Sequence, residues 1–251
     1  MQLYGLIGYP LGHSFSQKYF SEKFAREGIG DAHFELFPIR SIAELPALLS
    51  THPDLRGLSV TIPHKESVTV YLDELDETAR AVGAVNCIRI KNGRLTGFNT
   101  DVIGFGQSLA AINGGQWASA GSSAIILGTG GASKAVAFVL KNLGMDYLFV
   151  SRSPEGASQI SYEAFHRLSP GDYSLIVHTT PLGTYPEVNN CPDLPFRQLG
   201  AKHLVYDLVY NPPETLLLQR AGAQGCAVKN GLEMLQLQAE AAWKIWQANH
   251  R

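Results

Sequence analysis

Apolar and polar positions along the chain form two alternating runs, and each run predicts strands that take turns with helices. In the first hundred residues, short apolar stretches predict strands and amphipathic stretches predict helices. The expected strands cover 2–8, 33–39 and 55–62, the expected helices follow Ser16 and cover 42–50 and 76–84, and 85–99 is expected to form a hairpin that turns at Asn92-Gly93. This alternation is typical of an α/β domain with a mostly parallel sheet.

A second run of strands and helices begins near residue 121. The segment 122–153 predicts a strand, a glycine turn, a helix and another strand. Further strands are expected within 173–183 and 203–210, a final amphipathic helix over 227–247, and a helix with a glycine- and serine-rich connection over 104–121. We therefore expect an α/β protein of two domains with a cleft between them. The first domain is residues 1–103, completed by a C-terminal helix over 229–251, and the second is residues 104–228.

The composition allows a large core and argues against several classes of protein. Of the 251 residues, 45% are hydrophobic and 17% are charged, and the net charge is -2. This balance predicts no nucleic-acid partner. The N-terminal stretch has no signal-peptide pattern, and no stretch of the sequence reaches the ~18 apolar residues of a membrane span, so we expect no membrane association. Three scattered cysteines predict no disulfide framework and no metal site, and they fit the reducing cytoplasm.

The glycine turn "ILGTGGAS" indicates dinucleotide binding. Gly128 and Gly130 follow an expected strand and open an expected helix. Glycines there let the backbone approach a pyrophosphate, and the helix N-terminus offers free N–H groups. The third position of this fingerprint, usually Gly or Ala, is Ser133. The alternative is a glycine-rich turn that serves packing alone.

The end of the next strand predicts which dinucleotide binds. An NAD site usually has an acidic residue there that binds the ribose 2′-hydroxyl. This chain has Ser151, Arg152 and Ser153 instead, a guanidinium and two hydroxyls that suit a 2′-phosphate. We therefore expect NADP. Arg152 is alternatively an ordinary exposed arginine, and the nearby Glu155 weakens the argument.

Polar residues follow the strand over 55–62. Thr61 and Lys65 lie at or beyond its carboxyl end, the edge where open α/β sheets bind ligands. A lysine there can exchange a proton with a hydroxyl or a ketone. Its best neighbour is Asp101, which is alternatively the N-cap of a helix beginning at Val102. His64 is assigned no role, because one interpretation is that it faces solvent.

Four more polar residues are candidates for binding a substrate. Ser14 and Ser16 would project to one side if their loop is extended, and two hydroxyls could bind a carboxylate. Ser16 is alternatively a helix N-cap. Asn86 lies in an apolar strand, so its amide must bond either to backbone or to a ligand. Gln238 lies on the apolar side of the last helix and meets either a loop or a pocket.

Taken together, these segments resemble the shikimate dehydrogenase family. The matching pieces occur in the family's order over residues 5–246: "GYPLGHSFS", "SVTIPHKE", "GAVNCI", "GFNTDVIGF", "LGTGGAS", "SRS", "HTTPLGTYP", "VYDLVYNPPET" and "GLEMLQLQAEAA". The resemblance implies a substrate-binding domain followed by a Rossmann-type NADP-binding domain. It also implies reversible, NADPH-dependent reduction of 3-dehydroshikimate to shikimate in aromatic amino-acid biosynthesis.

The resemblance also implies roles for individual residues. Lys65 and Asp101 look like the catalytic pair. The implied substrate-binding residues are Ser14, Ser16, Thr61, Asn86, Gln238 and Tyr206. The implied cofactor-binding residues are Gly128, Gly130, Gly131, Ala132, Ser133, Ser151, Arg152, Ser153, Thr180, Leu208 and Gly231. No metal is implied, and a monomer or a homodimer is expected.

Three departures from the family pattern affect these expectations. Ser151-Arg152-Ser153 replaces Asn-Arg-Thr and a second arginine is missing, which puts strict NADP selectivity in doubt. Thr184 replaces a methionine after the "TPLG" glycine, and Glu233 replaces a glycine of the last helix. Three other functions stay open: an NAD-using quinate/shikimate dehydrogenase, a nonenzymatic NADP-binding regulator, and an unrelated reductase on a similar scaffold.

Overall fold

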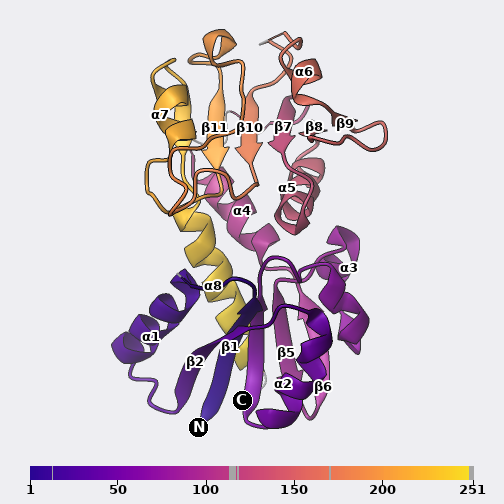
Figure 1. Cartoon of the computed structure of the whole chain (residues 1–251), viewed down its shortest axis with the longest axis vertical. Coiled ribbons are helices and arrows are strands. Elements are labelled where there is room, and N and C mark those ends of the chain that lie inside the picture. Colours follow the sequence, from indigo (N-terminus) through magenta and orange to yellow (C-terminus); the bar gives the residue numbers. More distant parts are fainter. Residues whose placement is uncertain (13, 113–116, 118, 170, 249–251) are drawn as a thin grey trace. The chain divides into compact units, whose positions relative to one another are not determined.

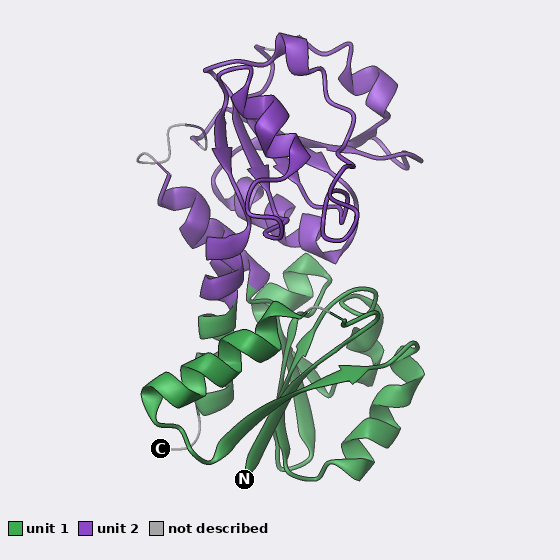
Figure 2. Cartoon of the chain, turned by 60° about the vertical axis from the view of Figure 1, so that its left-hand side comes forward, with its two compact units in different colours: residues 1–100, 239–251 green, residues 101–238 purple. Residues whose placement is uncertain are grey.

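The computed structural model describes residues 1–12, 14–112, 117, 119–169 and 171–248. The chain divides into two compact units (Figures 1 and 2). Unit 1 is Met1–Thr100 with Ala239–Arg251, and unit 2 is Asp101–Gln238. Part of the expected connection over 104–121 and the last three residues of the expected segment 229–251 lie outside the described residues.

Unit 1 is built on a six-stranded sheet of order β2-β1-β3-β5-β6-β4. Its strands are β1 (Gln2–Gly8), β2 (Ala32–Pro38), β3 (Leu55–Val60), β4 (Glu74–Leu75), β5 (Cys87–Lys91) and β6 (Arg94–Phe98). β1 pairs in parallel with β2 and β3, whereas β5 pairs antiparallel with β3 and β6. The expected hairpin is confirmed, because Asn92 and Gly93 both adopt the positive φ angles that a tight hairpin turn requires.

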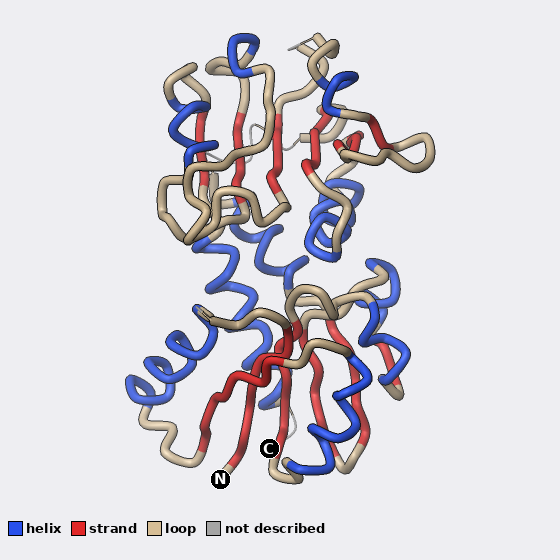
Figure 3. The backbone as a smooth tube through the Cα atoms, in the orientation of Figure 1, coloured by secondary structure: helices blue, strands red, loops and turns tan. Residues whose placement is uncertain are grey.

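Helices cover both faces of this sheet (Figure 3). They are α1 (Phe15–Glu27), α2 (Leu45–Thr51), α3 (Glu77–Val82) and two 3-10 turns, Ile42–Glu44 and Ser67–Tyr71. Residues 239–247 of α8 (Leu232–Gln247) also belong to unit 1. On one face, Phe20 of α1 and Trp246 of α8 pack with Tyr4 of β1. On the other face, Leu45 and Ala79 pack on the sheet, so each amphipathic helix buries its apolar side.

A buried lysine joins α1 to the C-terminal part of α8 within unit 1. The Lys23 ammonium lies 2.8 Å from a Glu27 oxygen and 2.9 Å from a Glu240 oxygen, and Tyr19 donates to Glu240 at 2.5 Å. The Lys23 side chain is 5% exposed. Burial alone would lower the pKa of Lys23, but its bonds to Glu27 and Glu240 raise it. Burial alone would raise the pKa of Glu240, but its bonds with Tyr19 and Lys23 lower it.

We expect Lys23→Met to destabilise unit 1 because it leaves Glu240 partly buried without its ammonium partner. The expected loss is about 2 kcal/mol in unfolding free energy by urea titration, below the range for fully buried pairs because Glu240 is a third exposed. The matched control is Lys18→Met, which removes an exposed ion pair on the same helix and should change little.

The stabilisation by Lys23 should also depend on pH. The pKa of Glu240 is lower in the folded chain, so its contribution is present above the carboxyl group's ordinary pKa and is lost as the pH falls through the lowered value. The difference in stability between the wild type and Lys23→Met should therefore shrink below about pH 4. A stability difference between the wild type and Lys23→Met that stayed constant down to roughly pH 2–3, below the ordinary pKa of a carboxyl group, would contradict this account of the pair.

Unit 2 has the sheet of a doubly wound dinucleotide-binding fold. Its six strands pair entirely in parallel in the order β12-β11-β10-β7-β8-β9. They are β7 (Ser123–Leu127), β8 (Asp146–Val150), β9 (Gln159–Ile160), β10 (Leu175–His178), β11 (Leu204–Asp207) and β12 (Ala227–Lys229). The chain starts at β7 and reverses direction across the sheet between β7 and β10, which confirms the expected Rossmann type.

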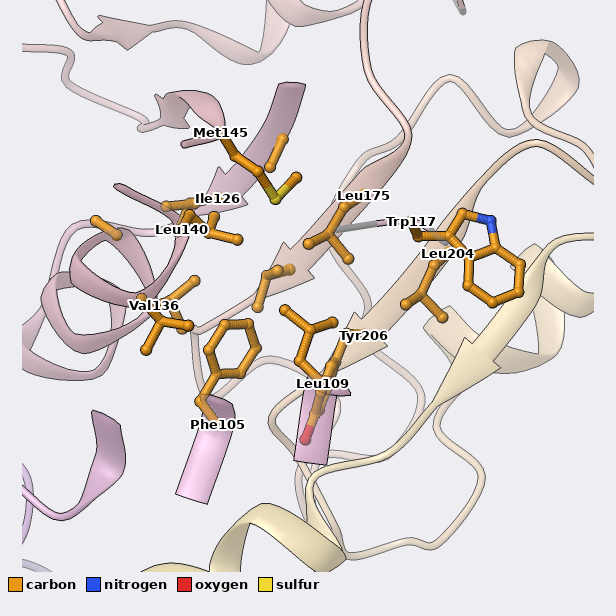
Figure 4. Packing of buried hydrophobic residues seen from close by; sticks show 14 of the residues in the cluster. Phe105, Leu109, Trp117, Ile126, Val136, Leu140, Met145, Leu175, Leu204 and Tyr206 are labelled. Carbon is orange, nitrogen blue, oxygen red and sulfur yellow. The ribbon is translucent and has the colours of Figure 1, made fainter. Parts of the chain in front are cut away.

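Helices of unit 2 pack on this sheet around two apolar clusters. They are α4 (Asp101–Ala110), α5 (Gly131–Asn142), α6 (Tyr162–Phe165), α7 (Leu216–Gly222), the start of α8 and a 3-10 turn at Phe196–Gln198. In the cluster that Figure 4 shows, Phe105 and Leu109 of α4 meet Val136 and Leu140 of α5 above the strands. The second cluster lies under α7, where Leu217 and Leu218 pack against Ile176 and Val205.

In unit 2 the structure confirms one expected strand, corrects the start of one helix and adds another helix. The strand expected within 173–183 is confirmed as the four residues of β10, and polar residues and Pro181 follow it. The helix expected over 227–247 begins at Leu232, and residues 227–229 form β12 instead. Helix α7 was not expected; the hydroxyl of Thr215 caps it by accepting from the Leu218 N–H at 3.4 Å.

Candidate functional site

In unit 1, two segments leave the sheet at the carboxyl ends of β1 and β3. The Thr61 N–H donates to the Ile7 carbonyl at 2.9 Å, and the Tyr9 N–H donates to the Ile62 carbonyl at 3.0 Å. Gly8 lies so close to Thr61 that a Cβ at this position would collide with the threonine methyl group. The predicted ligand residues of both segments are therefore brought to the same edge of the sheet.

Ser14 is the N-cap of α1, and its hydroxyl is available for a ligand. The residue has extended backbone angles, but its side chain makes no capping hydrogen bond. Its Oγ is buried, and it has no hydrogen-bond partner among the residues that the structure describes. A buried hydroxyl in this state costs about 1–3 kcal/mol, which a hydrogen bond to a ligand would recover.

Ser16 does not take the alternative role that the sequence left open for it. Helix α1 begins at Phe15, so Ser16 is its second residue and the N-cap interpretation is wrong. The extended loop that would have placed Ser14 and Ser16 side by side is also absent, because only Ser14 has extended angles. Ser16 is half-buried in the first helical turn and remains a candidate.

Lys65 follows a tight turn that a buried histidine anchors. The His64 N–H donates to the Thr61 carbonyl at 2.9 Å, and the His64 Nε2 lies 2.8 Å from the Ile39 carbonyl. The interpretation that His64 faces solvent is wrong, since the residue is 3% exposed. Lys65 itself is half-buried, and its carbonyl accepts from the Val85 N–H at 2.7 Å. The turn therefore holds the base of the lysine and leaves its side chain partly accessible.

Asn86 is bonded to a neighbouring segment of unit 1. Its amide N–H donates to the Thr100 hydroxyl at 3.0 Å, and its amide oxygen accepts from the Thr100 N–H at 2.6 Å. Asn99 donates to the Ala84 carbonyl at 2.8 Å beside it. The sequence left open whether the Asn86 amide bonds to the protein or to a ligand, and the structure shows Thr100 as its partner. These bonds fix the segment that leads directly into Asp101.

Asp101 is the first residue of α4 and is 5% exposed. The alternative that it caps a helix beginning at Val102 is wrong, because the helix begins at Asp101 itself. A negative charge in a first helical turn is favoured by the helix dipole. Asp101 belongs to unit 2 and Lys65 to unit 1, so their pairing stays a prediction.

Gln238 lies where α4 and α8 approach each other within unit 2. A Cβ at Gly104 would lie 3.0 Å from the Cβ of Gln238 and 2.5 Å from the Met234 carbonyl, so glycine permits this close contact. The Gln238 side chain donates to the Leu235 carbonyl at 2.9 Å and is half-buried. It therefore remains a candidate for ligand binding.

Tyr206 is a core residue of unit 2, and we remove it from the substrate set. Its side chain is fully buried in the cluster of Figure 4, where its hydroxyl donates to Ser108 at 2.8 Å, and burial raises its pKa. Tyr210, in the same "VYDLVYNPPET" segment, lies beyond the end of β11 and is half-buried. Its place after a strand end makes it a further candidate.

The glycine turn of unit 2 has the geometry that a pyrophosphate requires. Gly128 has a φ of +108°, and a Cβ there would lie 2.8 Å from the Thr180 methyl group. Gly130 has ordinary angles, and a Cβ there would meet nothing within 4 Å. Folding therefore does not require glycine at 130, and the space beside it is open. Gly131 and Ala132 follow as the first residues of α5, whose N–H groups are free of intrahelical acceptors.

Ser133 supports the turn through its side chain rather than contacting solvent. It is fully buried, and its hydroxyl donates to the Gly130 carbonyl at 2.6 Å. Close packing of helix on strand is the role of the third fingerprint position. A serine there is therefore compatible with the fingerprint.

Ser151, Arg152 and Ser153 follow β8 beside the glycine turn, because the Gly128 N–H donates to the Val150 carbonyl at 3.0 Å. The Ser153 N–H donates to the Ser151 hydroxyl at 3.2 Å, which closes a small turn. Arg152 is exposed, and within the described part of the chain it forms no ion pair, with Glu155 or any other acid. Its guanidinium is therefore available for an anionic ligand.

The loops after β10 and β11 bring three predicted cofactor residues to this edge. The Leu208 N–H donates to the His178 carbonyl at 2.9 Å, two residues before Thr180. A Cβ at Gly231 would collide with the Leu208 carbonyl, so only glycine fits there. His178 and Asp207, the last residues of β10 and β11, are fully buried beneath these loops, and neither was among the residues predicted from the sequence.

Two of the departures from the family pattern have local partners. Glu233 bonds to Lys229 and accepts from the Ser108 hydroxyl at 3.1 Å, and the bond with Lys229 lowers its pKa. Thr184 bonds through its backbone N–H to the Pro181 carbonyl at 3.2 Å. In the described ranges, no group of three or more histidine, cysteine or acidic side chains is placed to hold a metal ion, and no helix has the length and hydropathy of a membrane span.

Comparison with known proteins identifies the family. Residues 6–88 match the family profile "Shikimate dehydrogenase substrate binding domain". The shikimate dehydrogenase (NADP(+)) of Desulforamulus reducens is 34% identical over 98% of this chain and 89% of its own length. The crystal structure of shikimate dehydrogenase 1 from Peptoclostridium difficile superposes with a TM-score of 0.89 at 31% identity, covering 100% of this chain and 93% of that one.

A third relative has both ligands bound. It is the shikimate 5-dehydrogenase of Thermus thermophilus in complex with NADP(H) and shikimate, 31% identical with a TM-score of 0.83, covering 99% of this chain and 94% of that one. These relatives match both units and not the glycine turn alone. The chain belongs to the shikimate dehydrogenase family.

Proposed function

We propose that this protein catalyses the reversible, NADPH-dependent reduction of 3-dehydroshikimate to shikimate, a step of aromatic amino-acid biosynthesis. The observation that carries the proposal is the extent of the family match, which spans 98% of the chain at 34% identity. The similarity to the NADP(+)-dependent shikimate dehydrogenase of Desulforamulus reducens therefore extends over both unit 1 and unit 2. A nonenzymatic regulator would need neither Lys65 nor Asp101, and both are present.

We assign substrate binding mainly to the polar residues at the carboxyl edge of unit 1. The unpartnered Ser14 hydroxyl and Ser16 would bind the carboxylate of the substrate. Thr61, Asn86 and Gln238 would bind ring hydroxyls, and Tyr210 replaces Tyr206 in this set. Asn86 is bonded to Thr100 already, so it would contact the substrate only with its remaining hydrogen-bonding capacity.

Lys65 and Asp101 would perform the proton chemistry. In the direction of reduction, the Lys65 ammonium donates a proton to the substrate oxygen as the ketone becomes a hydroxyl. In the reverse direction, the neutral amine accepts that proton. The Asp101 carboxylate would hold the ammonium in position. The tight turn at Thr61–His64 supports this role, because it fixes the backbone of the lysine and leaves its side chain partly accessible.

The residues of unit 2 fit NADP. Gly130 leaves open space where a pyrophosphate would approach, the first turn of α5 offers N–H donors, and Arg152 is free to bind a 2′-phosphate. When bound, NADPH supplies the hydride that reduces the ketone carbon. The protein's contribution is to hold the pyrophosphate, select the phosphorylated ribose and deliver the proton from Lys65.

One assay tests the proposal directly. The purified protein should be incubated with shikimate or quinate, each with NADP or NAD, and formation of the reduced cofactor followed by absorbance. We expect the highest kcat/KM for shikimate with NADP. If no combination gave turnover, the proposed dehydrogenase activity would be excluded. A preference for quinate with NAD would favour the NAD-using quinate/shikimate dehydrogenase.

Arg152 is expected to set the preference for NADP. Removing the guanidinium in Arg152→Ala should raise KM for NADP about tenfold and leave KM for NAD almost unchanged, because only NADP carries the 2′-phosphate. Arg167→Ala, which removes an exposed arginine elsewhere in unit 2, is the control. An unchanged ratio of the two KM values in Arg152→Ala would remove the arginine from the site.

We also propose that the reaction takes place in the cytoplasm. All three cysteines, Cys87, Cys191 and Cys226, are free thiols, which suits a reducing compartment. Burial raises the pKa of each thiol, so none is activated for redox chemistry.

A further inference from the structure

A chain of buried polar side chains runs through the ends of β10 and β11 to the loop carrying Thr180. His178 and Asp207 are register partners in the two strands, and both are fully buried. The His178 Nδ1 lies 2.8 Å from an Asp207 oxygen, and its Nε2 lies 2.5 Å from the Thr180 hydroxyl. All of these residues belong to unit 2.

The other partners of Asp207 define it as an acceptor. The Val209 N–H donates to one carboxylate oxygen at 2.9 Å, and the Thr215 hydroxyl donates to the other at 2.6 Å. Thr215 can donate its proton there because its oxygen accepts from the Leu218 N–H. A carboxylate with these donors also accepts a hydrogen bond from the histidine ring.

The direction of each hydrogen bond follows from this acceptor. Since Asp207 accepts from Nδ1, a ring that carries a single proton carries it on Nδ1, and its Nε2 is then an acceptor; the proposal below is made for this form of the ring. The Thr180 hydroxyl must therefore donate its own proton inward to Nε2. Its oxygen keeps two lone pairs, one of which is approached by the Leu182 N–H at the long distance of 3.4 Å. Thr180 thus offers an acceptor, and not a donor, to any ligand.

The sheet topology places Thr180 beside the nicotinamide half of a bound dinucleotide. The strand order reverses between β7 and β10, and dinucleotides bind across the crevice at such a point. The glycine turn after β7 takes the pyrophosphate, and Arg152 after β8 marks the adenosine side. The β10 side is left for the nicotinamide, and Thr180 lies over the glycine turn, in contact range of Gly128.

We propose that Thr180 accepts a hydrogen bond from the carboxamide NH2 of the nicotinamide, and that His178 and Asp207 are positioning residues that keep Thr180 an acceptor. The inference rests on the proposed use of NADP. The carboxamide has one N–H-bearing side and one carbonyl side. An acceptor-only hydroxyl selects the N–H-bearing side, and this fixes the rotation of the carboxamide and orients the ring.

The test compares the binding of NADP with that of its 3-acetylpyridine analogue, in which a methyl group replaces the carboxamide NH2. Dissociation constants measured by calorimetry do not require turnover. We expect the wild-type protein to bind NADP roughly three- to tenfold more tightly than the analogue, the difference that one hydrogen bond makes. If the protein bound neither nucleotide, the proposed function would fail. If it bound both equally, this inference alone would fail.

Three variants locate the effect. Thr180→Val, which removes the hydroxyl at a half-buried position, should bring the ratio of dissociation constants close to one, and Thr180→Ser should restore it. Thr179→Val is the matched control, because the Thr179 hydroxyl donates to the Leu127 carbonyl, so the ratio should stay at the wild-type value. If Thr180→Val kept the wild-type ratio of the two dissociation constants, the inference would be overturned.

His178→Phe tests the positioning role. Phenylalanine occupies the ring volume but cannot accept from Thr180, so the freed hydroxyl could donate to the acetyl carbonyl and the analogue should bind relatively more tightly. Circular dichroism and NADP affinity establish whether this buried variant folds. A folded His178→Phe protein with the wild-type ratio would show that His178 does not position Thr180.

Discussion

Lys65→Ala is expected to lower kcat by roughly 10²–10⁴, the usual contribution of a general acid or base, with KM for shikimate changed little. The half-buried lysine follows a turn that His64 anchors to the Ile39 carbonyl, and the variant keeps these bonds of the turn. The variant should therefore unfold at the same urea concentration as the wild type. Steady-state kinetics in both directions, with urea titration beside them, provide the measurement.

Lys91→Ala is the matched control for Lys65→Ala. Lys91 ends β5, which is antiparallel to β3, so it lies at the opposite edge of the same sheet from Lys65. Its removal should leave kcat unaffected. Near-native turnover of Lys65→Ala, or an equal loss in Lys91→Ala, would exclude Lys65 as the specific proton donor.

Gly130→Val is expected to raise the dissociation constant for NADP by roughly 10- to 100-fold, or about 1.4–2.8 kcal/mol, and to leave the free energy of unfolding nearly unchanged. The backbone of Gly130 is extended, and a Cβ there meets no protein atom within 4 Å. The added side chain would therefore occupy space that the fold leaves to the pyrophosphate.

Gly128→Val separates the two reasons for glycine in this turn. At Gly128 the φ of +108° disfavours any side chain, and a Cβ would contact Thr180 at 2.8 Å. This variant should lose stability, by about 1–3 kcal/mol for the backbone strain, as well as NADP affinity. If Gly130→Val were as unstable as Gly128→Val, or bound NADP normally, the close approach of the cofactor at Gly130 would be refuted.

The sequence predicted the fold well wherever a periodic pattern or a turn residue is local. The positive φ angles of Asn92 and Gly93 and the break at Gly128 are properties of single residues, and they gave the hairpin and the βαβ unit correctly. Helix α7 and the three-residue β12 were missed. Both are short, and the three residues of β12 do not establish a period of their own; it forms because it pairs with β11.

The candidate site was predicted less completely because burial and hydrogen-bond partners are not local properties. Helix α1 begins two residues earlier than expected, so its cap is Ser14 and not Ser16. Tyr206 and Tyr210 belong to one motif, and only the fold shows that Tyr206 is in the core. His178 and Asp207 lie 29 residues apart, and strand pairing alone brings them together.

The most direct test is a crystal structure of the protein with shikimate and NADP. It should show the Lys65 Nζ and the Asp101 carboxylate within hydrogen-bond distance of the same substrate hydroxyl, the one whose carbon faces the nicotinamide ring. Shikimate bound with Lys65 directed away from that hydroxyl, or with Asp101 in contact with neither, would contradict the proposed mechanism.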